Sequence, residues 1–483
     1  MVKIKEINDK ILKIPVFLLL TYFIYRLINQ SKMIFTFPID NVANDHSFHM
    51  LNLHLLQNYG FHNLIPNFLP CQMFLFKAYT PGWSFFALPL QLIFNNPQLV
   101  AYISLILIYI LGFIFINYLG NLLNLSKIKK IAFFLFFYAN PLAIGYFLRL
   151  GKYSEMLAWT FFIIFFTLIL KYKEKELDEK FFLILIPYTL ILMTNISVFI
   201  FSSLILFSLF IIKKPIKEKL KITSIPVISI LISSFWLFLY IRSLPLSKIF
   251  ITFSLSDKVL LILMPFVFII LYFFFIKNNK EDRNFYLPSL ILAILLLTKI
   301  TNLIPILKNI LPDSYNIYFI FLSTTFLLKT KFPNKIRKIV LLFIPILIIT
   351  GIIASIIITP FFIPYTQEIK ESLDLLKDVN EKLLIINPDM PNSEISAIYN
   401  YGIINHNIRP TWYSPDEVCS QPQEILKSKN YLKEGNCKLF LELWKEQQIK
   451  EIITFNQFCS TLKSCEDLIL LKEKQKTCLF KIK

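Results

Sequence analysis

The sequence predicts a polytopic α-helical membrane protein of about eleven spans, followed by a C-terminal extracytoplasmic α/β domain. Three observations lead to this fold class: 56% of the 483 residues are hydrophobic, only 17% are charged, and the mean hydropathy is +0.61. A soluble protein has too little interior to bury so much apolar surface. We therefore expect a transmembrane domain at 1–364 and a soluble domain at 365–483.

Apolar runs long enough to cross a bilayer recur along the first domain. We expect spans at 14–35, 97–119, 131–148, 155–171, 222–241, 258–276 and 338–359, with shorter candidates at 286–300 and 316–329. The apolar stretch 181–212 is too long for one span, and the residues MTNIS interrupt it. This interruption predicts two short helices, 181–194 and 196–212.

Lys-rich segments fall on every second connection between the expected spans. They are KIKK (127–130), KYKEKELDEK (171–180), KKPIKEKLK (213–221), KNNKEDR (277–283) and KTKFPNKIRK (329–338). Positively charged connections stay in the cytoplasm, so we expect a cytoplasmic N-terminus and an extracytoplasmic C-terminal domain in a multi-pass protein of the cell membrane. The net charge of +19 resides largely in these connections. No basic stripe interleaved with stacking aromatics indicates a nucleic-acid partner.

Two regions do not have the composition of membrane helix. The first outer loop, 36–96, is far too long for a simple connection. After Pro360, short strand-like runs at 383–387, 451–455, 467–471 and 478–482 alternate with helical patterns, which predicts an α/β or α+β domain.

The cysteines indicate an oxidising environment. Five of the six lie in the C-terminal domain, at Cys419, Cys437, Cys459, Cys465 and Cys478, and the sixth is Cys71 in the first outer loop. This distribution favours disulfides over zinc, because the tail has no CxxC and a single histidine. Since five is odd, one tail cysteine is free unless Cys71 pairs with it.

The first outer loop begins with DNVANDHSFHMLNLH (40–54), which places two aspartates and three histidines just after the first span. A helix that starts near Asp45 would carry Asp45, His49 and Asn52 on one face. Such a helix could lie in the membrane interface with its polar edge toward a cavity. The simpler interpretation is that Asp45 only caps this helix, with His49 as its hydrogen-bonding neighbour.

This loop resembles the first outer loop of the type C glycosyltransferase superfamily. More narrowly, it is similar to prokaryotic integral membrane proteins related to 6-pyruvoyl-tetrahydropterin synthase, in which a D-x-x-x-H motif precedes a Y-x-P segment before the second span. Asp45 and His49 match the first motif, and Tyr79 and Pro81, within YTPGW, match the second. The shared layout covers the whole chain, but the motifs occupy only about positions 40–83.

The resemblance implies an enzyme that uses a sugar linked to a polyprenyl phosphate. Asp45 would be the catalytic base, with Asp40 as the second candidate, and Glu155 would be the acidic residue of the next outer loop. A divalent cation such as Mg²⁺ or Mn²⁺ is compatible with this role of the first carboxylate. The expected partners are the lipid-linked donor and membrane lipids, while the sugar, the carrier and the acceptor stay open.

Glycosyl transfer needs a base near the acceptor oxygen and cations near the departing phosphate. Cations are scarce on the expected outer side, where Arg149, Lys152, Arg242 and Lys299 stand at the ends of spans. Arginine forms the better fork for phosphate, so we expect Arg149 and Arg242 to bind it, together with Lys152 and Tyr79. Each cation could equally be a snorkelling anchor at the lipid headgroups, and Glu155 could simply pair with Lys152.

Three other kinds of protein compete with a glycosyltransferase. A transporter or flippase for a lipid-linked substrate would place its polar groups at the bilayer midplane and often contains repeats. A metal-dependent enzyme could use Asp45, His46 and His49, but this set is short of ligands. A non-catalytic assembly factor would use the outer domain to bind a partner.

Overall fold

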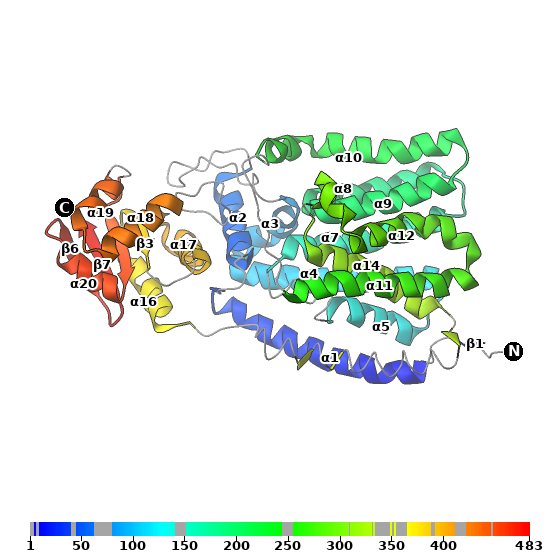
Figure 1. Ribbon diagram of the computed structural model, residues 1–483, viewed down its shortest axis with the longest axis horizontal. Helices are drawn as coiled ribbons and strands as arrows, with labels where there is room; N and C mark the ends of the chain where they lie inside the picture. Colours follow the sequence, from blue (N-terminus) through cyan, green and yellow to red (C-terminus); the bar gives the residue numbers. More distant parts are fainter. Residues whose placement is uncertain are drawn as a thin grey trace.

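The structure is a computed structural model in which helices dominate and a small sheet lies near the C-terminus (Figure 1). It describes residues 4–5, 9–39, 45–61, 80–140, 151–243, 255–308, 310–330, 332–333, 348–349, 352–353, 365–387, 392–410, 422–445 and 448–483. The expected span at 338–359 lies almost entirely outside these residues. The N-terminus and the sheet domain are at opposite ends of the long axis (Figure 1).

The helices before residue 330 run roughly parallel to this long axis (Figure 1). They are α1 (Asp9–Ser31), α4 (Pro97–Leu122), α5 (Lys127–Tyr138), α7 (Tyr153–Tyr172), α8 (Leu185–Thr194), α9 (Ile196–Ile212), α10 (Ile216–Ser243), α11 (Leu255–Asn278), α12 (Arg283–Leu297) and α14 (Pro312–Lys329). Two shorter helices, α2 (Asp45–Tyr59) and α3 (Gly82–Phe94), belong to the first outer loop.

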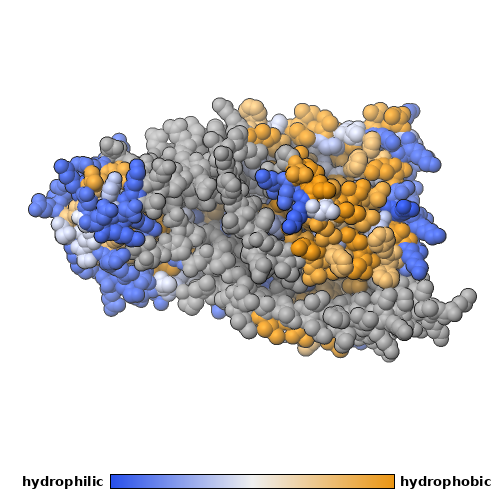
Figure 2. Space-filling view, viewed as in Figure 1, coloured by the Kyte–Doolittle hydropathy of each residue, from blue (hydrophilic) through white to orange (hydrophobic). Residues whose placement is uncertain are grey.

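Five of the described helices, namely α1, α4, α7, α10 and α11, are long and apolar enough to cross a membrane. Of these five helices, α7 is the most enclosed, because 78% of the residues in its apolar segment are buried, against 28% in α10. Hydrophobic side chains form a band over the helices in the face shown in Figure 2, while hydrophilic ones cover the sheet domain and the opposite end. The helical part is thus compatible with insertion into a membrane.

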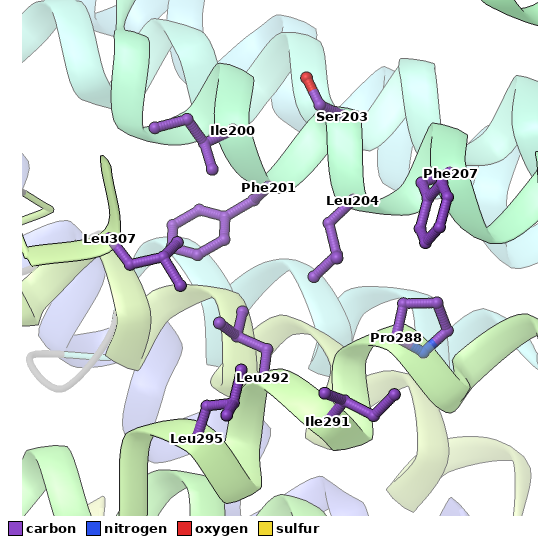
Figure 3. Close-up of a pocket in the computed structure, with 10 residues that line it drawn as sticks. All are labelled: Ile200, Phe201, Ser203, Leu204, Phe207, Pro288, Ile291, Leu292, Leu295 and Leu307. Atoms are coloured by element: carbon purple, nitrogen blue, oxygen red, sulfur yellow. The ribbon is translucent and has the colours of Figure 1, made fainter. Parts of the chain in front are cut away.

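The interruption at MTNIS does divide one apolar stretch into two helices, as the sequence predicts. Asn195 adopts an extended backbone between α8 and α9, and its side chain accepts a hydrogen bond from the N–H of Val198 at 3.0 Å. Asparagine is a strong N-cap residue because its side-chain oxygen satisfies a free amide of the first turn. Further along, α9 packs on α12 with an apolar cavity between them (Figure 3).

Several Lys-rich connections meet at one end of the helices. Lys173 forms an ion pair with Asp282, and Glu218 accepts a hydrogen bond from the N–H of Leu177. The strand pair β1 (Ile4–Lys5) and β2 (Phe332–Pro333) joins the N-terminus to the last Lys-rich segment. The Lys-rich segments 171–180, 213–221 and 277–283 therefore lie together in space, as loops on one side of a membrane would.

The C-terminal sheet has five strands in the order β4-β3-β5-β7-β6. The strands are β3 (Lys382–Ile386), β4 (Arg409–Pro410), β5 (Glu451–Phe455), β6 (Leu468–Glu473) and β7 (Thr477–Ile482). β3 pairs in parallel with β4 and β5, whereas β7 runs antiparallel to β5 and β6. The four strand-like runs found in the sequence are all strands. The helices of this domain are α16 (Gln367–Leu375), α17 (Asn392–His406), α18 (Pro422–Lys433), α19 (Cys437–Lys445) and α20 (Gln457–Lys463).

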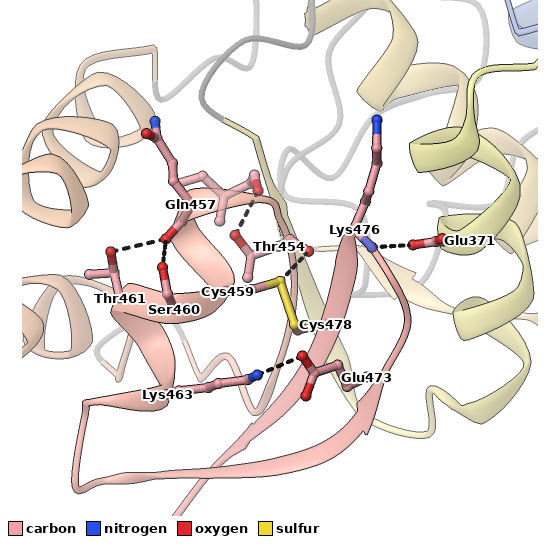
Figure 4. Close-up of a disulfide and its surroundings, with 11 residues drawn as sticks. Glu371, Thr454, Gln457, Cys459, Ser460, Thr461, Lys463, Glu473, Lys476 and Cys478 are labelled. Atoms are coloured by element: carbon pink, nitrogen blue, oxygen red, sulfur yellow. Dashed lines mark hydrogen bonds and ion pairs between the residues drawn. A yellow bond between two sulfur atoms is a disulfide. The ribbon is translucent and has the colours of Figure 1, made fainter.

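Two disulfides join elements of this domain, which confirms the expectation of disulfides in the tail. Cys437 pairs with Cys465, and Cys459 on α20 pairs with Cys478 on β7 (Figure 4). The remaining cysteines, Cys71 and Cys419, lie outside the described residues. Disulfides indicate an oxidising environment and hint that this domain is extracytoplasmic.

The sheet domain is attached to the helical part through α2. Helix α17 packs on α2 (Figure 1), and the buried Asn400 donates a side-chain hydrogen bond to the hydroxyl of Ser47 at 2.9 Å. The ring of Phe37 contacts that of Tyr401 with centroids 5.4 Å apart, and the Tyr365 hydroxyl donates to the carbonyl of Phe37. The start of the first outer loop is therefore enclosed between the two parts.

We predict that a peptide map without reductant contains the Cys437–Cys465 and Cys459–Cys478 crosslinks. They close chain segments of 28 and 19 residues, so each is expected to stabilise the domain by about 3 to 4 kcal/mol in the chain-entropy account. Replacing either pair by serines should lower the melting temperature of the domain. Six thiols alkylated in the unreduced, denatured protein would contradict the prediction.

Candidate functional site

The site is built where the first turn of α2 meets the start of α7. Gly151 has φ +71°, and a Cβ at this position would lie only 2.4 Å from the backbone nitrogen of His46. A glycine is required here, both for the left-handed backbone and for the close approach. Two residues later, the Tyr153 hydroxyl forms a 2.7 Å hydrogen bond with Nδ1 of His46.

An aromatic cluster fills the space behind this contact. Trp83 stacks on Tyr153 with centroids 5.1 Å apart, and the His49 ring lies 5.2 Å from Trp83 and 5.7 Å from Tyr153. All three side chains are buried. Burial, with a second contribution from nearby His46, lowers the pKa of His49 to about 3. The imidazole is therefore neutral at physiological pH, and its position favours a packing and orienting role over contact with substrate.

The YTPGW segment attaches this cluster to the corner between α8 and α9. The Thr80 hydroxyl donates to the backbone carbonyl of Thr194. A Cβ on Gly82 would lie 2.4 Å from Oγ1 of Thr194, so only glycine allows this approach. Trp83 then enters the aromatic cluster. Thr80, Gly82 and Trp83 of this motif therefore each have a structural role. Tyr79 lies outside the described residues.

Charged groups converge on Lys152, at the N-terminal end of α7. Its ammonium nitrogen lies 3.4 Å from Oδ2 of Asp313, the second residue of α14. Glu155, in the first turn of α7, is buried and accepts a hydrogen bond from the hydroxyl of Ser314. Burial opposes the charged ammonium, but Glu155, Asp313 and Asp45 together raise the pKa of Lys152 above its ordinary value. Lys152 is thus a cation paired with Asp313, and the carboxyl groups of Glu155 and Asp45 favour its charged form.

The structure brings together Asp45, Lys152 and Glu155, which are three of the predicted site residues. His49 lies one helical turn beyond Asp45 on α2, within the aromatic cluster. Asp40 and Arg149 lie outside the described residues. Arg242 is in the last turn of α10, in a part whose side chains the structure does not describe.

Two further charged side chains were missed by sequence reasoning. Asp313 lies 161 residues from Lys152, and its only local sign is a Pro-Asp-Ser helix start. Arg26 is buried in α1, where its guanidinium donates to the carbonyl of Ala139 at 2.8 Å. A cation inside a span is costly unless it is paired, and here it caps the C-terminal end of α5.

Within the described residues, no group of three or more His, Cys, Asp and Glu side chains could hold a metal ion. The carboxyl group of Asp313 instead pairs with the ammonium of Lys152, and that of Glu155 accepts a hydrogen bond from Ser314. The described part of the chain therefore shows no set of donors for a divalent cation.

Comparison with known proteins adds no relative. No family model matches the chain, and no curated protein matches it. Inferences about this site therefore depend on its own geometry.

We predict that acid weakens the packing around α2 through His49. The folded pKa of about 3 lies below the ordinary value of 6.5, so between these values the unfolded chain binds a proton that the folded protein does not. Stability is therefore lost as the pH falls from 6.5 toward 3. At about pH 5 the loss amounts to about 2 kcal/mol.

The test compares apparent melting temperatures of the purified protein near pH 7 and near pH 5. His49→Gln should reduce the difference between the two, whatever it does to the absolute value. His406→Gln, which changes a half-buried histidine of the sheet domain, should leave most of the difference in place. Equal acid sensitivity of wild type and His49→Gln would contradict the prediction.

Proposed function

We propose that this protein is a membrane glycosyltransferase that moves a sugar from a polyprenyl-phosphate-linked donor to an acceptor on the outer face of the membrane. The observation that carries the proposal is the convergence of Asp45, Glu155 and Asp313 on Lys152, beside the domain that carries the disulfides. These groups come from three separate connections. Convergence of this kind is typical of a site rather than of independent headgroup anchors.

In the proposed reaction the carboxylate of Asp45 accepts the proton of the acceptor hydroxyl. The hydroxyl oxygen then forms a bond to the anomeric carbon of the donor sugar. The bond between that carbon and the phosphate oxygen breaks, and the lipid phosphate leaves with the electron pair. Lys152 is placed to stabilise the negative charge that develops on the phosphate, while Glu155 and Asp313 hold its ammonium in position.

The position of Lys152 supports this function over a headgroup anchor. Only 16% of its side-chain surface is exposed, whereas the Lys299 side chain at the end of α12 is exposed. A snorkelling lysine extends its ammonium toward water and lipid headgroups. Lys152 instead turns toward Asp313, beside the buried Glu155, at a cost in desolvation that a mere anchor does not require.

Incubation of the purified protein with polyprenyl-phosphate sugars, followed by measurement of lipid-phosphate release, tests the proposal. Release that depends on an added acceptor is expected. A flippase for a lipid-linked substrate would move the intact donor across a vesicle membrane without cleaving it. An assembly factor would do neither.

We predict that Asp45→Asn lowers turnover by about a hundredfold or more, as loss of a general base does. The amide keeps the shape of the side chain and one of its oxygens, so expression and folding should change little. Asp374→Asn is the matched control, because Asp374 is an exposed acid of the sheet domain paired with Lys377. More than about a tenth of wild-type turnover in Asp45→Asn would exclude Asp45 as the base.

The proposed topology has about eleven spans, with the Lys-rich connections inside the cell and the sheet domain outside. Single cysteines are introduced at Lys130 and at Pro215 into a background that keeps the two disulfides and lacks Cys71 and Cys419. They should resist an impermeant thiol reagent in intact cells. A cysteine at Lys472, on the exposed edge of the sheet domain, should react. Labelling at position 130 or 215 from outside would overturn this topology.

A further inference from the structure

A cavity of about 320 Å³ lies between α9 and α12, and its lining includes none of the residues of the charged cluster. Nine of its ten lining residues are apolar, and the side chains of both helices point into the same space (Figure 3). They include Phe201, Leu204 and Phe207 from α9 and Pro288 and Leu292 from α12. The lining is therefore hydrocarbon on both walls.

The polar residue of the lining, Ser203, forms its hydrogen bonds within the protein and needs none from a ligand. The hydroxyl of Ser203 shares a 2.7 Å hydrogen bond with that of Tyr188 and donates to the carbonyl of Phe199 at 2.8 Å. A polar molecule in this space would lose its hydrogen bonds to water and find none in return. The cavity thus suits an aliphatic chain.

The shape and position of the cavity indicate a membrane lipid. Lining residues extend over 200–207 in α9 and 288–295 in α12, which at 1.5 Å per residue is about 10 Å along the helix axes. Phe207 and Ile291 at its edge are about half exposed, at 52% and 49%, so the cavity opens to the surface of the helical part. A chain inside would run parallel to the helices, as lipid tails do in a bilayer.

Two lysines lie beside one end of the cavity. Lys308 directly follows the lining residue Leu307, and Lys299 follows the end of α12 by two residues. Both side chains are exposed. They are the only charged residues of the sequence between Arg283 and Asp313. Exposed lysines at the ends of apolar helices can attract the phosphate of an anionic lipid.

We propose that the α9–α12 cavity binds one acyl chain of an anionic membrane phospholipid, with its phosphate at Lys299 and Lys308. The site is separate from Asp45 and Lys152 and does not depend on the proposed transferase reaction. Lipid tails are as apolar as the cavity wall, so moving a tail from bilayer to cavity brings no hydrophobic gain. Preference for a particular lipid must therefore come from the phosphate and the two lysines.

The experiment places the full-length protein in nanodiscs of phosphatidylcholine and phosphatidylglycerol. A trace of phosphatidylglycerol with a photoactivatable diazirine in its acyl chain is then crosslinked, and the labelled peptides are mapped by mass spectrometry. Label should concentrate on α9 and α12. Lys299→Gln and Lys308→Gln should each lower the labelling of these helices about fivefold, with little change for a phosphatidylcholine probe.

Ile291→Trp fills the open edge of the cavity and should remove most of this label. Its matched control is Leu231→Trp on α10, an exposed apolar position at 66% outside the cavity. Leu204→Trp is a second cavity-filling variant, and the melting temperature of each variant reports its folding. Equal labelling of α10 and the cavity helices, or of Ile291→Trp and Leu231→Trp, would overturn the proposal. Stronger labelling by a polyprenyl-phosphate probe would assign the cavity to another lipid and overturn it as well.

Discussion

The rest of the site depends on the close contact between Gly151 and the backbone of His46. A side chain at position 151 would have to displace α2 from α7, because its Cβ would lie 2.4 Å from the His46 nitrogen. The contact brings His46 to the hydroxyl of Tyr153 and leaves Asp45 close enough to influence Lys152. A polar helix of the outer loop is thereby fixed against the most enclosed of the five long apolar helices, so the acidic group is held by packing as well as by charge.

The electrostatics of the cluster follow from this packing. An ammonium as enclosed as that of Lys152 is stable only with acidic neighbours, and Asp313 and Glu155 provide them from α14 and α7. Ser314 then donates to Glu155, which couples the two helices a second time. A structural ion pair alone would need one carboxyl group. The further carboxyl groups near Lys152, those of Glu155 and Asp45, are the feature that supports the proposed function.

Sequence reasoning succeeded where the cause is local. The break at Asn195 was visible because a capping residue interrupts an apolar run, and the strand at 451–455 because five apolar-rich residues stand between helical patterns. It failed where the partner is remote: Asp313 meets Lys152 across 161 residues, and Arg26 meets Ala139 across 113. Hydrophobic periodicity specifies which face of a helix is buried, but it does not specify the neighbour that the face meets.

Helix α2 connects this cluster to the sheet domain. Within its first turn, His46 faces α7, whereas the buried Ser47 accepts a hydrogen bond from Asn400 of α17. A helix of 15 residues is marginal in isolation, so its position is determined by the surfaces on both sides. Phe37, just before the loop, also contacts Tyr401 of the same α17. Movement of the sheet domain would therefore act directly on the segment that carries Asp45, and an acceptor bound by that domain would be presented next to the proposed base.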